Sequence, residues 1–302
     1  MNIVICTQPA LKPNVTAWFV VQSLLAAGHH PHYQRAIKKE ARVLYEILAN
    51  EGSNIALLCK IIHHLPYSWQ FKIFEFLTVP GRIRHFILRK NAIEAQAREW
   101  LAESPKKQVV ILGAGLDILS LRLAVDFPQV NFIEIDMEES QRFKTSVLHS
   151  HHVAIPSNVE YLSGDLSKGL HDVIKRSRYV KETPTLWIAE GLLMFLPENN
   201  CRNLFKEIHA LSIAEATVIF TTLSKTYQGS WFARNFQKIY LRKKKSDFKW
   251  TIAPNDVPRF MEELGYDITK QIVLEALHKD YITPHSRLID ELGDDIHVAV
   301  CQ

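Results

Sequence analysis

The most informative stretch of the chain is QVVILGAGLD, residues 108–117. Its first half is a short, β-branched apolar run, which is typical of a strand buried in a parallel sheet. Gly113 and Gly115 follow at once, in a chain that has only 11 glycines among 302 residues. Because glycine has no Cβ atom, this pattern predicts a tight turn whose backbone can approach a ligand closely.

Downstream of this stretch, similar apolar runs recur with helical stretches between them. Such alternation predicts an α/β fold, in which a parallel sheet is covered by helices on both faces. Residues 255–265 (NDVPRFMEELG) predict a helix between the last sheet elements. The predicted strands are 108–112, 131–135, 158–162, 185–189 and 216–223, with 268–274 and 297–301 as two further candidates.

Upstream of the stretch, the pattern is helical. The predicted helices are 17–27, 34–50, 55–64, 69–77 and 82–103. We therefore expect an N-terminal helical part, residues 1–104, packed on a core of residues 105–302 as one integrated domain. The apolar run 17–27 is far shorter than the ~20 residues of a membrane-spanning helix, so we expect no integral membrane segment.

The composition is that of an ordinary globular protein. Hydrophobic residues make up 47% and charged residues 23%, which excludes intrinsic disorder and fibrous architecture. The net charge of +4 is too small to indicate nucleic-acid binding, and we interpret the basic run 242–245 as a solvated surface. The 4 cysteines have neither metal-ligand spacing nor the density of a disulfide framework. We therefore expect reduced thiols, no metal site and a cytoplasmic location.

Polar residues follow the later strands at the point where each strand ends. Asp136 follows the second strand, Asp165 the third and Glu190 the fourth. The carboxyl ends of parallel strands meet at one edge of a sheet, where ligands bind. A carboxylate there can accept hydrogen bonds from both ribose hydroxyls, and another can accept one from an adenine amino group. The pattern therefore predicts a nucleoside ligand.

The residues after Gly115 indicate which kind of nucleoside ligand is favoured. The dinucleotide fingerprint requires a third glycine at position 118, which is Ile118 here. Asp117 would repel a pyrophosphate but tolerate a ligand with a positive centre, such as a sulfonium. These two residues disfavour a nicotinamide dinucleotide.

Four stretches together resemble the leucine carboxyl methyltransferase family, which comprises class I methyltransferases that use S-adenosylmethionine. They are 108–117, 132–136 (FIEID), 164–167 (GDLS) and 184–196 (PTLWIAEGLLMFL). The segment 89–94 (RKNAIE) resembles the Arg-containing segment that precedes the first strand in this family. The resemblance implies a Rossmann-like sheet of seven strands with the last antiparallel. It also implies that the N-terminal helices form a lid over the cofactor.

The resemblance also implies a set of cofactor-binding residues. Arg89 would contact the carboxylate of the methionine moiety, and Lys38 and Lys39 are candidates for a second basic partner. The remaining residues would surround the cofactor: Gly113 and Gly115 the methionine part, Asp136 the ribose, Asp165 and Leu166 the adenine, and Glu190 the amino group or the methyl-transfer site. No catalytic general base is assigned.

The sequence thus predicts an S-adenosylmethionine-dependent O-methyltransferase whose product is S-adenosylhomocysteine. Its acceptor would be a carboxylate or hydroxyl of a small molecule or a peptide end. One alternative is a nucleotide-dependent (NAD) oxidoreductase. The other is a non-catalytic S-adenosylmethionine-binding protein, suggested only by Phe195, where the family often has Tyr. Two interpretations of the aromatic stretch 225–260 are kept: it belongs to the core or to an interface, or it forms a wall of the substrate site.

Overall fold

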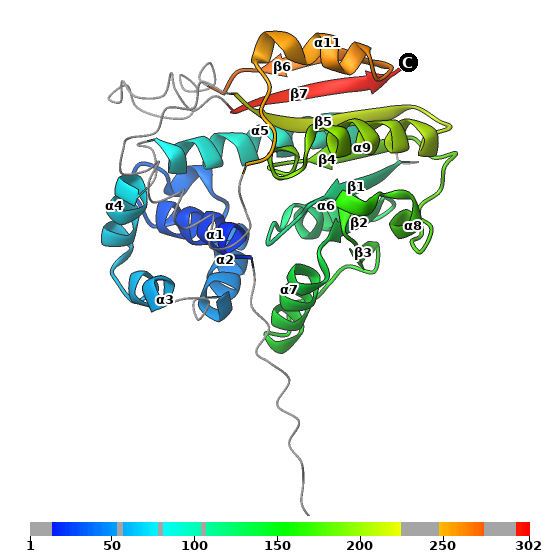
Figure 1. Cartoon of the computed structure of the whole chain (residues 1–302). Coiled ribbons are helices and arrows are strands. Elements are labelled where there is room, and N and C mark those ends of the chain that lie inside the picture. The colour runs from blue at the N-terminus through cyan, green and yellow to red at the C-terminus, as the bar shows by residue number, and fades with distance from the viewer. Residues whose placement is uncertain (1–13, 53–56, 78–80, 104–106, 225–247, 275–293) are drawn as a thin grey trace, which may run out of the picture.

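A mixed sheet of seven strands forms the centre of the computed structural model (Figure 1). The structure describes residues 14–52, 57–77, 81–103, 107–224, 248–274 and 294–302. The strand order is β3-β2-β1-β4-β5-β7-β6, with β7 antiparallel to both of its neighbours. The bounds are β1 Gln108–Leu112, β2 Asn131–Asp136, β3 Val159–Ser163, β4 Thr185–Ala189, β5 Ala216–Leu223, β6 Tyr266–Ile272 and β7 Asp294–Cys301. The predicted fold class and the antiparallel last strand are confirmed.

The central strands begin and end where the apolar runs do. Strands β1, β4 and β5 have the predicted bounds, because each is buried along its whole length. The edge strand β6 was predicted two residues too late. It is largely exposed, and its pairing with β7 is irregular between Ile268 and Lys270, so no continuous apolar run marks it.

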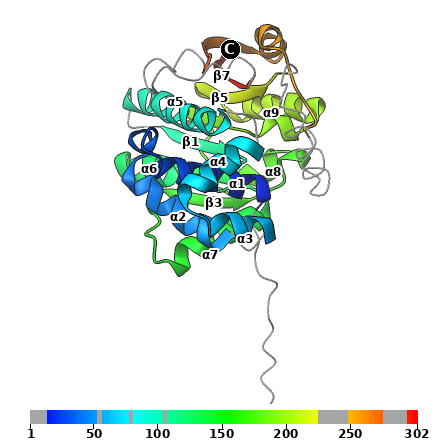
Figure 2. The same cartoon turned by 90° about the vertical axis from the view of Figure 1, so that its left-hand side faces the viewer.

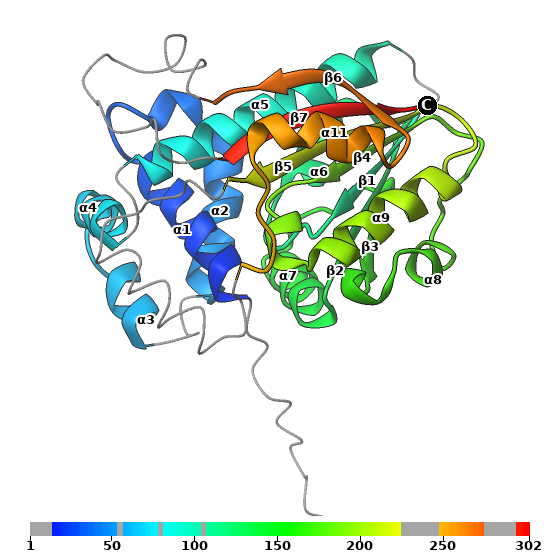
Figure 3. The same cartoon turned by 45° about the horizontal axis from the view of Figure 1, so that its top comes forward.

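Helices cover both faces of the sheet (Figure 3). Alternate residues of a strand point to opposite faces, so Val110 and Leu112 pack with α8, α9 and α11, while Val109 and Ile111 pack with α5 and α6. The helices on the first face are α8 His171–Ile174, α9 Glu198–Leu211 and α11 Val257–Glu262, and on the second α5 Arg82–Ala102 and α6 Leu119–Asp126.

The N-terminal helices gather beside the sheet, and Figure 2 shows them in front of the strands. They are α1 Val15–Gly28, α2 Lys39–Gly52, α3 Leu57–His63 and α4 Tyr67–Leu77. The Trp18 indole donates to the Ala49 carbonyl (3.0 Å), which fixes α1 on α2. The predicted helix 34–50 is divided, because Ile37 has an extended backbone between the 3₁₀ turn Gln34–Ala36 and α2.

Two helices connect these N-terminal helices to the sheet. The first part of α5 packs with α1, α2 and α4, and the rest of α5 packs on β1 and β4. Helix α7 (Glu138–Ser150) covers β2 and β3 and also contacts α2. This arrangement places α1 and α5 opposite the carboxyl ends of the central strands.

The expectations about a membrane segment and about residues 225–260 can be compared with the structure only within the described residues. Within the ranges that the structure describes, no helix is both long and apolar enough to cross a bilayer. The basic run 242–245 and most of the aromatic stretch 225–260 lie outside the described residues. Trp250, at the end of that stretch, is buried in the core with α9 and α11.

Candidate functional site

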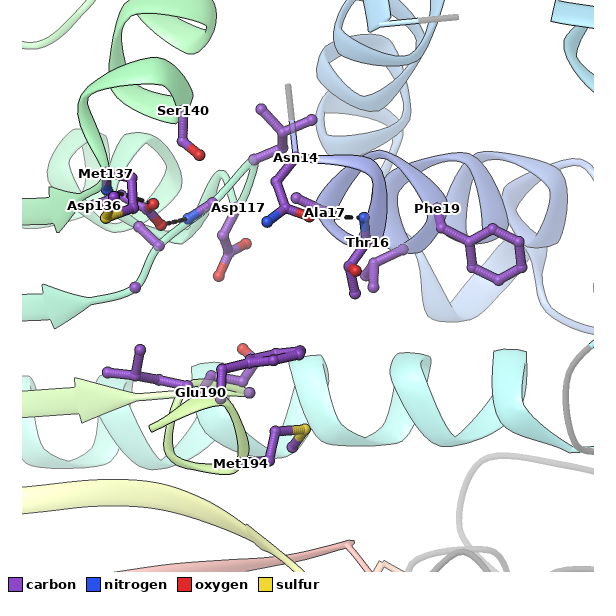
Figure 4. Close-up of a pocket in the computed structure, with 18 of the residues that line it drawn as sticks. Asn14, Thr16, Ala17, Phe19, Asp117, Asp136, Met137, Ser140, Glu190 and Met194 are labelled. Carbon is purple, nitrogen blue, oxygen red and sulfur yellow. Dashed lines mark hydrogen bonds between the residues drawn. The ribbon is translucent and has the colours of Figure 1, made fainter. Parts of the chain in front are cut away.

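A cavity of about 570 Å³ lies between α1, α5 and the carboxyl ends of the parallel strands (Figure 4). Figure 4 shows Asp136 and Asp117 on the sheet side, Glu190 below them and Asn14 reaching in from the start of α1. The predicted cofactor-binding residues all line it: Arg89, Gly113, Gly115, Asp136, Asp165, Leu166 and Glu190. The tertiary structure therefore brings together residues spread over about a hundred positions of the sequence.

The glycine turn after β1 forms the floor of this cavity. Gly113 and Gly115 have φ angles of +67° and +56°, a left-handed conformation that side chains make costly. A Cβ atom at Gly113 would lie 2.8 Å from Cδ1 of Leu192, and one at Gly115 would lie 3.3 Å from Cβ of Ala17. Glycine at these positions thus brings the backbone close to Leu192 and to α1.

Gly113→Ala should lower the free energy of unfolding by about 1–2 kcal/mol because of the left-handed backbone, and by more because of the contact with Leu192. Gly191→Ala is the matched control. Its φ is +63°, but its new Cβ would have only an ordinary 3.7 Å contact with Arg89. Chemical denaturation measures both variants, and equal losses would contradict a close contact at Gly113.

Asp136, at the end of β2, faces the glycine turn. Its Oδ2 accepts from the N–H of Gly115 and its Oδ1 from the N–H of Met137, both at 2.6 Å. Burial raises the pKa of Asp136 above the usual range, although these N–H groups act in the opposite direction. The Ser140 side chain also hydrogen-bonds to this carboxylate, which has about four acceptor sites, so part of its acceptor capacity remains for a ligand hydroxyl group.

Asp165 and Leu166, after β3, lie at another side of the cavity. Oδ1 of Asp165 accepts from the backbone N–H of Ser167 (3.0 Å) and from its hydroxyl (2.6 Å). These hydrogen bonds hold the pKa of Asp165 below its usual range, so it stays an acceptor. Leu166 is buried and supplies an apolar surface beside it.

Two basic residues of α5 and two acidic residues of the strand ends form an ion-pair cluster. Nε of Arg89 lies 3.0 Å from Oε1 of Glu190, and Nζ of Lys90 lies 3.0 Å from Oε2 of Glu190 and 2.9 Å from Oδ2 of Asp117. Burial disfavours the charge of Lys90, but Asp117 and Glu190 outweigh it and raise its pKa. Burial likewise opposes the charge of Asp117, yet Lys90 holds its pKa below the usual range.

This cluster contains a basic residue that sequence reasoning missed. Neither Lys38 nor Lys39 lines the cavity, and Nζ of Lys38 pairs with Oε1 of Glu94 at 3.2 Å. Lys90 does line it, beside Arg89. Its adjacency to Arg89 was the available signal, but only the contacts of α5 with β1 and β4 show that both side chains reach the strand ends.

The start of α1 also contributes more than was predicted. Oδ1 of Asn14 accepts from the N–H of Thr16 (2.8 Å) and caps the helix, and Thr16, Ala17 and Phe19 line the cavity.

Among the residues that the structure describes, no group of three or more His, Cys, Asp or Glu side chains is placed to hold a metal ion.

Comparisons with known proteins agree with this geometry. The family model described as leucine carboxyl methyltransferase matches residues 61–209. A predicted S-adenosyl-L-methionine-dependent methyltransferase of Frankia alni is 30% identical over 160 residues, which cover 46% of this chain and 55% of that protein. One of Mycobacteroides abscessus is 35% identical over 113 residues, covering 37% of this chain and 36% of the relative. The chain thus matches about half or less of the length of these relatives.

A solved structure extends the comparison to the whole fold. A predicted methyltransferase from Thermobifida fusca has a TM-score of 0.55 at 14% identity and covers 99% of both chains. The strand order, the antiparallel β7 and the glycine turn after β1 define a class I S-adenosylmethionine-dependent methyltransferase fold. Within that class, the family model described as leucine carboxyl methyltransferase matches residues 61–209, just under half of the chain. The predicted resemblance to this family is confirmed, and the predicted cofactor agrees with the relatives' names.

Proposed function

We propose that this protein is an S-adenosylmethionine-dependent O-methyltransferase that acts on a small molecule or a peptide end. The observation that carries the proposal is that four strand ends and α5 bring a left-handed glycine turn, four carboxylates and Arg89 into one cavity. The family match and the relatives' names support the same reaction class.

The residues of the cavity fit the cofactor part by part. The remaining acceptor capacity of Asp136 suits a ribose hydroxyl, and Asp165 with Leu166 suits an adenine amino group and ring. Arg89 suits a carboxylate, and Glu190 suits an ammonium group beside it. Gly113 and Gly115 line the same cavity, and their left-handed backbone forms the turn beside Asp136.

When bound, the cofactor supplies a methyl group already activated for transfer. The chain's own work is then to hold the acceptor oxygen in line with that group, and such alignment can contribute ~7–11 kcal/mol. The O–CH₃ bond forms as the S–CH₃ bond breaks, and the electron pair of the broken bond stays on sulfur.

The ionisable residues of the cavity favour a carboxylate acceptor. No histidine is among the described lining residues, and each lining carboxylate is already engaged by N–H groups, a hydroxyl or a cation. An alcohol needs a base to remove its proton, whereas a carboxylate is ionised at pH 7 and loses none. We therefore propose that the chain methylates a carboxylate in preference to a hydroxyl.

The proposed function is tested by calorimetric titration with S-adenosylhomocysteine, with NADH as the control ligand. We expect dissociation constants in the micromolar range for S-adenosylhomocysteine and no heat with NADH, because Ile118 and Asp117 disfavour a pyrophosphate. Binding of NADH alone would support an oxidoreductase. Cofactor binding without methyl transfer to any of a broad panel of carboxylates would support a non-catalytic binding protein.

A further inference from the structure

Beyond the strand ends, the cavity continues into a part that the proposed cofactor contacts do not use. We call it the outer chamber and define it by its walls. Phe86 comes from α5, and Phe19 from α1, where Figure 4 shows it away from Asp136. Phe195 and Phe248 form a further wall, with ring centroids 5.6 Å apart. These apolar walls suit a ligand with an apolar body.

Helix α5 contributes part of the wall of the cavity and extends from the strand ends into the outer chamber. Arg82, Phe86 and Arg89 all line the cavity, and the guanidinium groups of Arg89 and Arg82 lie 5.2 Å and 5.9 Å from the centroid of the Phe86 ring. Arg82 and Arg89 are seven positions apart, which is about 10 Å along a helix. Arg82 is thus displaced along α5 from Arg89, and both guanidinium groups lie near the Phe86 ring.

Charge is distributed unevenly along the cavity. Its described acidic lining residues are all at strand ends: Asp117, Asp136, Asp165 and Glu190. The outer chamber is lined by Arg82 and Lys249, and the N–H of Lys249 donates to the Met194 carbonyl (2.8 Å), which fixes its backbone. Glu75 interacts electrostatically with Arg82 from outside the cavity lining, and its carboxylate accepts from the N–H groups of Gly81 and Ile83.

We propose that the methyl acceptor is an apolar-bodied dianion. One carboxylate would receive the methyl group at the strand ends, the body would contact Phe86 and Phe195, and a second anionic group would bind Arg82 and Lys249. This inference rests on the proposed function and specifies its substrate class. The transfer itself is unchanged, because the second anionic group takes no part in bond making or breaking.

The test compares decanedioate with decanoate, which have the same chain length and differ in one terminal carboxylate. Calorimetry on the chain saturated with S-adenosylhomocysteine should give about tenfold tighter binding of the diacid, the effect of a charge-assisted contact. Arg82→Gln together with Lys249→Gln should abolish that difference while leaving the affinity for decanoate within about twofold. The control variant is Lys72→Gln, which removes an exposed charge from the neighbouring helix α4. This variant should retain the preference for decanedioate.

Each result decides the inference. Equal binding of the two acids by the wild-type chain would overturn it, as would a tenfold preference that persists in the Arg82/Lys249 double variant. In both cases S-adenosylhomocysteine still binds, so the proposed function stands. Absence of S-adenosylhomocysteine binding would instead overturn the proposed function, and the inference with it.

Discussion

Lys144→Met should lower the free energy of unfolding by about 3–5 kcal/mol, the largest effect that we expect from a single substitution outside the strand-end ion pairs. The side chains of Lys144 and Glu134 are fully buried, and Nζ of Lys144 lies 2.6 Å from Oε2 of Glu134. Removing the cation leaves the Glu134 carboxylate inside the protein, where the Ser120 hydroxyl is the remaining side-chain donor among the described residues. An uncompensated buried charge of this kind is strongly destabilising.

The measurement is chemical denaturation of three variants. Lys144→Met and Glu134→Leu alone should each be destabilised, whereas the Glu134→Leu/Lys144→Met double variant should recover much of the loss, because both charges are then absent. Additive losses in the double variant would show that the two charges do not stabilise each other. Substituting Lys72, an exposed lysine of α4, should change stability by less than about 0.5 kcal/mol.

Lys144 also contacts the backbone of the candidate cofactor cavity. Nζ of Lys144 also donates to the carbonyl of Asp117, at the end of the glycine turn. It therefore ties α7 and β2 to the backbone that lines the cavity. We expect the double variant to bind S-adenosylhomocysteine more weakly than the wild-type chain even where its stability is recovered.

Asp136→Ala should weaken binding of S-adenosylhomocysteine by about 1–3 kcal/mol, because it removes the acceptor and leaves buried polar groups without partners. Asp136→Asn should not rescue binding. The amide has an NH₂ group in place of one carboxylate oxygen, so one of the two N–H groups, of Gly115 or Met137, would face a donor instead of an acceptor. Calorimetry measures both variants, with Asp172→Ala, an exposed carboxylate of α8, as the control. Wild-type affinity in Asp136→Ala would contradict the ribose-binding role.

The affinity should also fall as the pH is lowered. The ionised form of Asp136 accepts the hydrogen bonds. An ordinary aspartate has a pKa of ~3.9. Burial raises the pKa of Asp136, so its protonation begins at a higher pH. Titration of the wild-type chain from pH 7.5 downward should show weakening before that ordinary value is reached. The pH dependence should be absent from the residual binding of Asp136→Ala.

Much of the fold could be predicted because local pattern and tertiary burial agree in the centre of the sheet. The runs at 108–112, 185–189 and 216–223 are strands with the predicted bounds, and each is buried throughout. The strand ends could be predicted for the same reason, since parallel strands deliver their carboxyl ends to one edge. The predicted bounds were wrong at two places. Strand β6 is largely exposed, so no apolar run marks it. Ile37 is buried although its backbone is extended, so the apolar pattern continues across the break between the two helical segments.

We could read from the amino-acid sequence alone the order of the strands along the chain, the glycine turn and the carboxylates that follow β2, β3 and β4. Which cations pair with the acidic side chains of the core and the site depends on how the helices pack. Lys90 rather than Lys38 reaches Asp117 and Glu190, and Lys144 reaches Glu134, because α5 and α7 pack against the sheet with those faces inward. The physical reason is that periodicity records which face of an element is buried, whereas an ion pair depends on the distance between side chains of different elements, up to about a hundred residues apart in sequence.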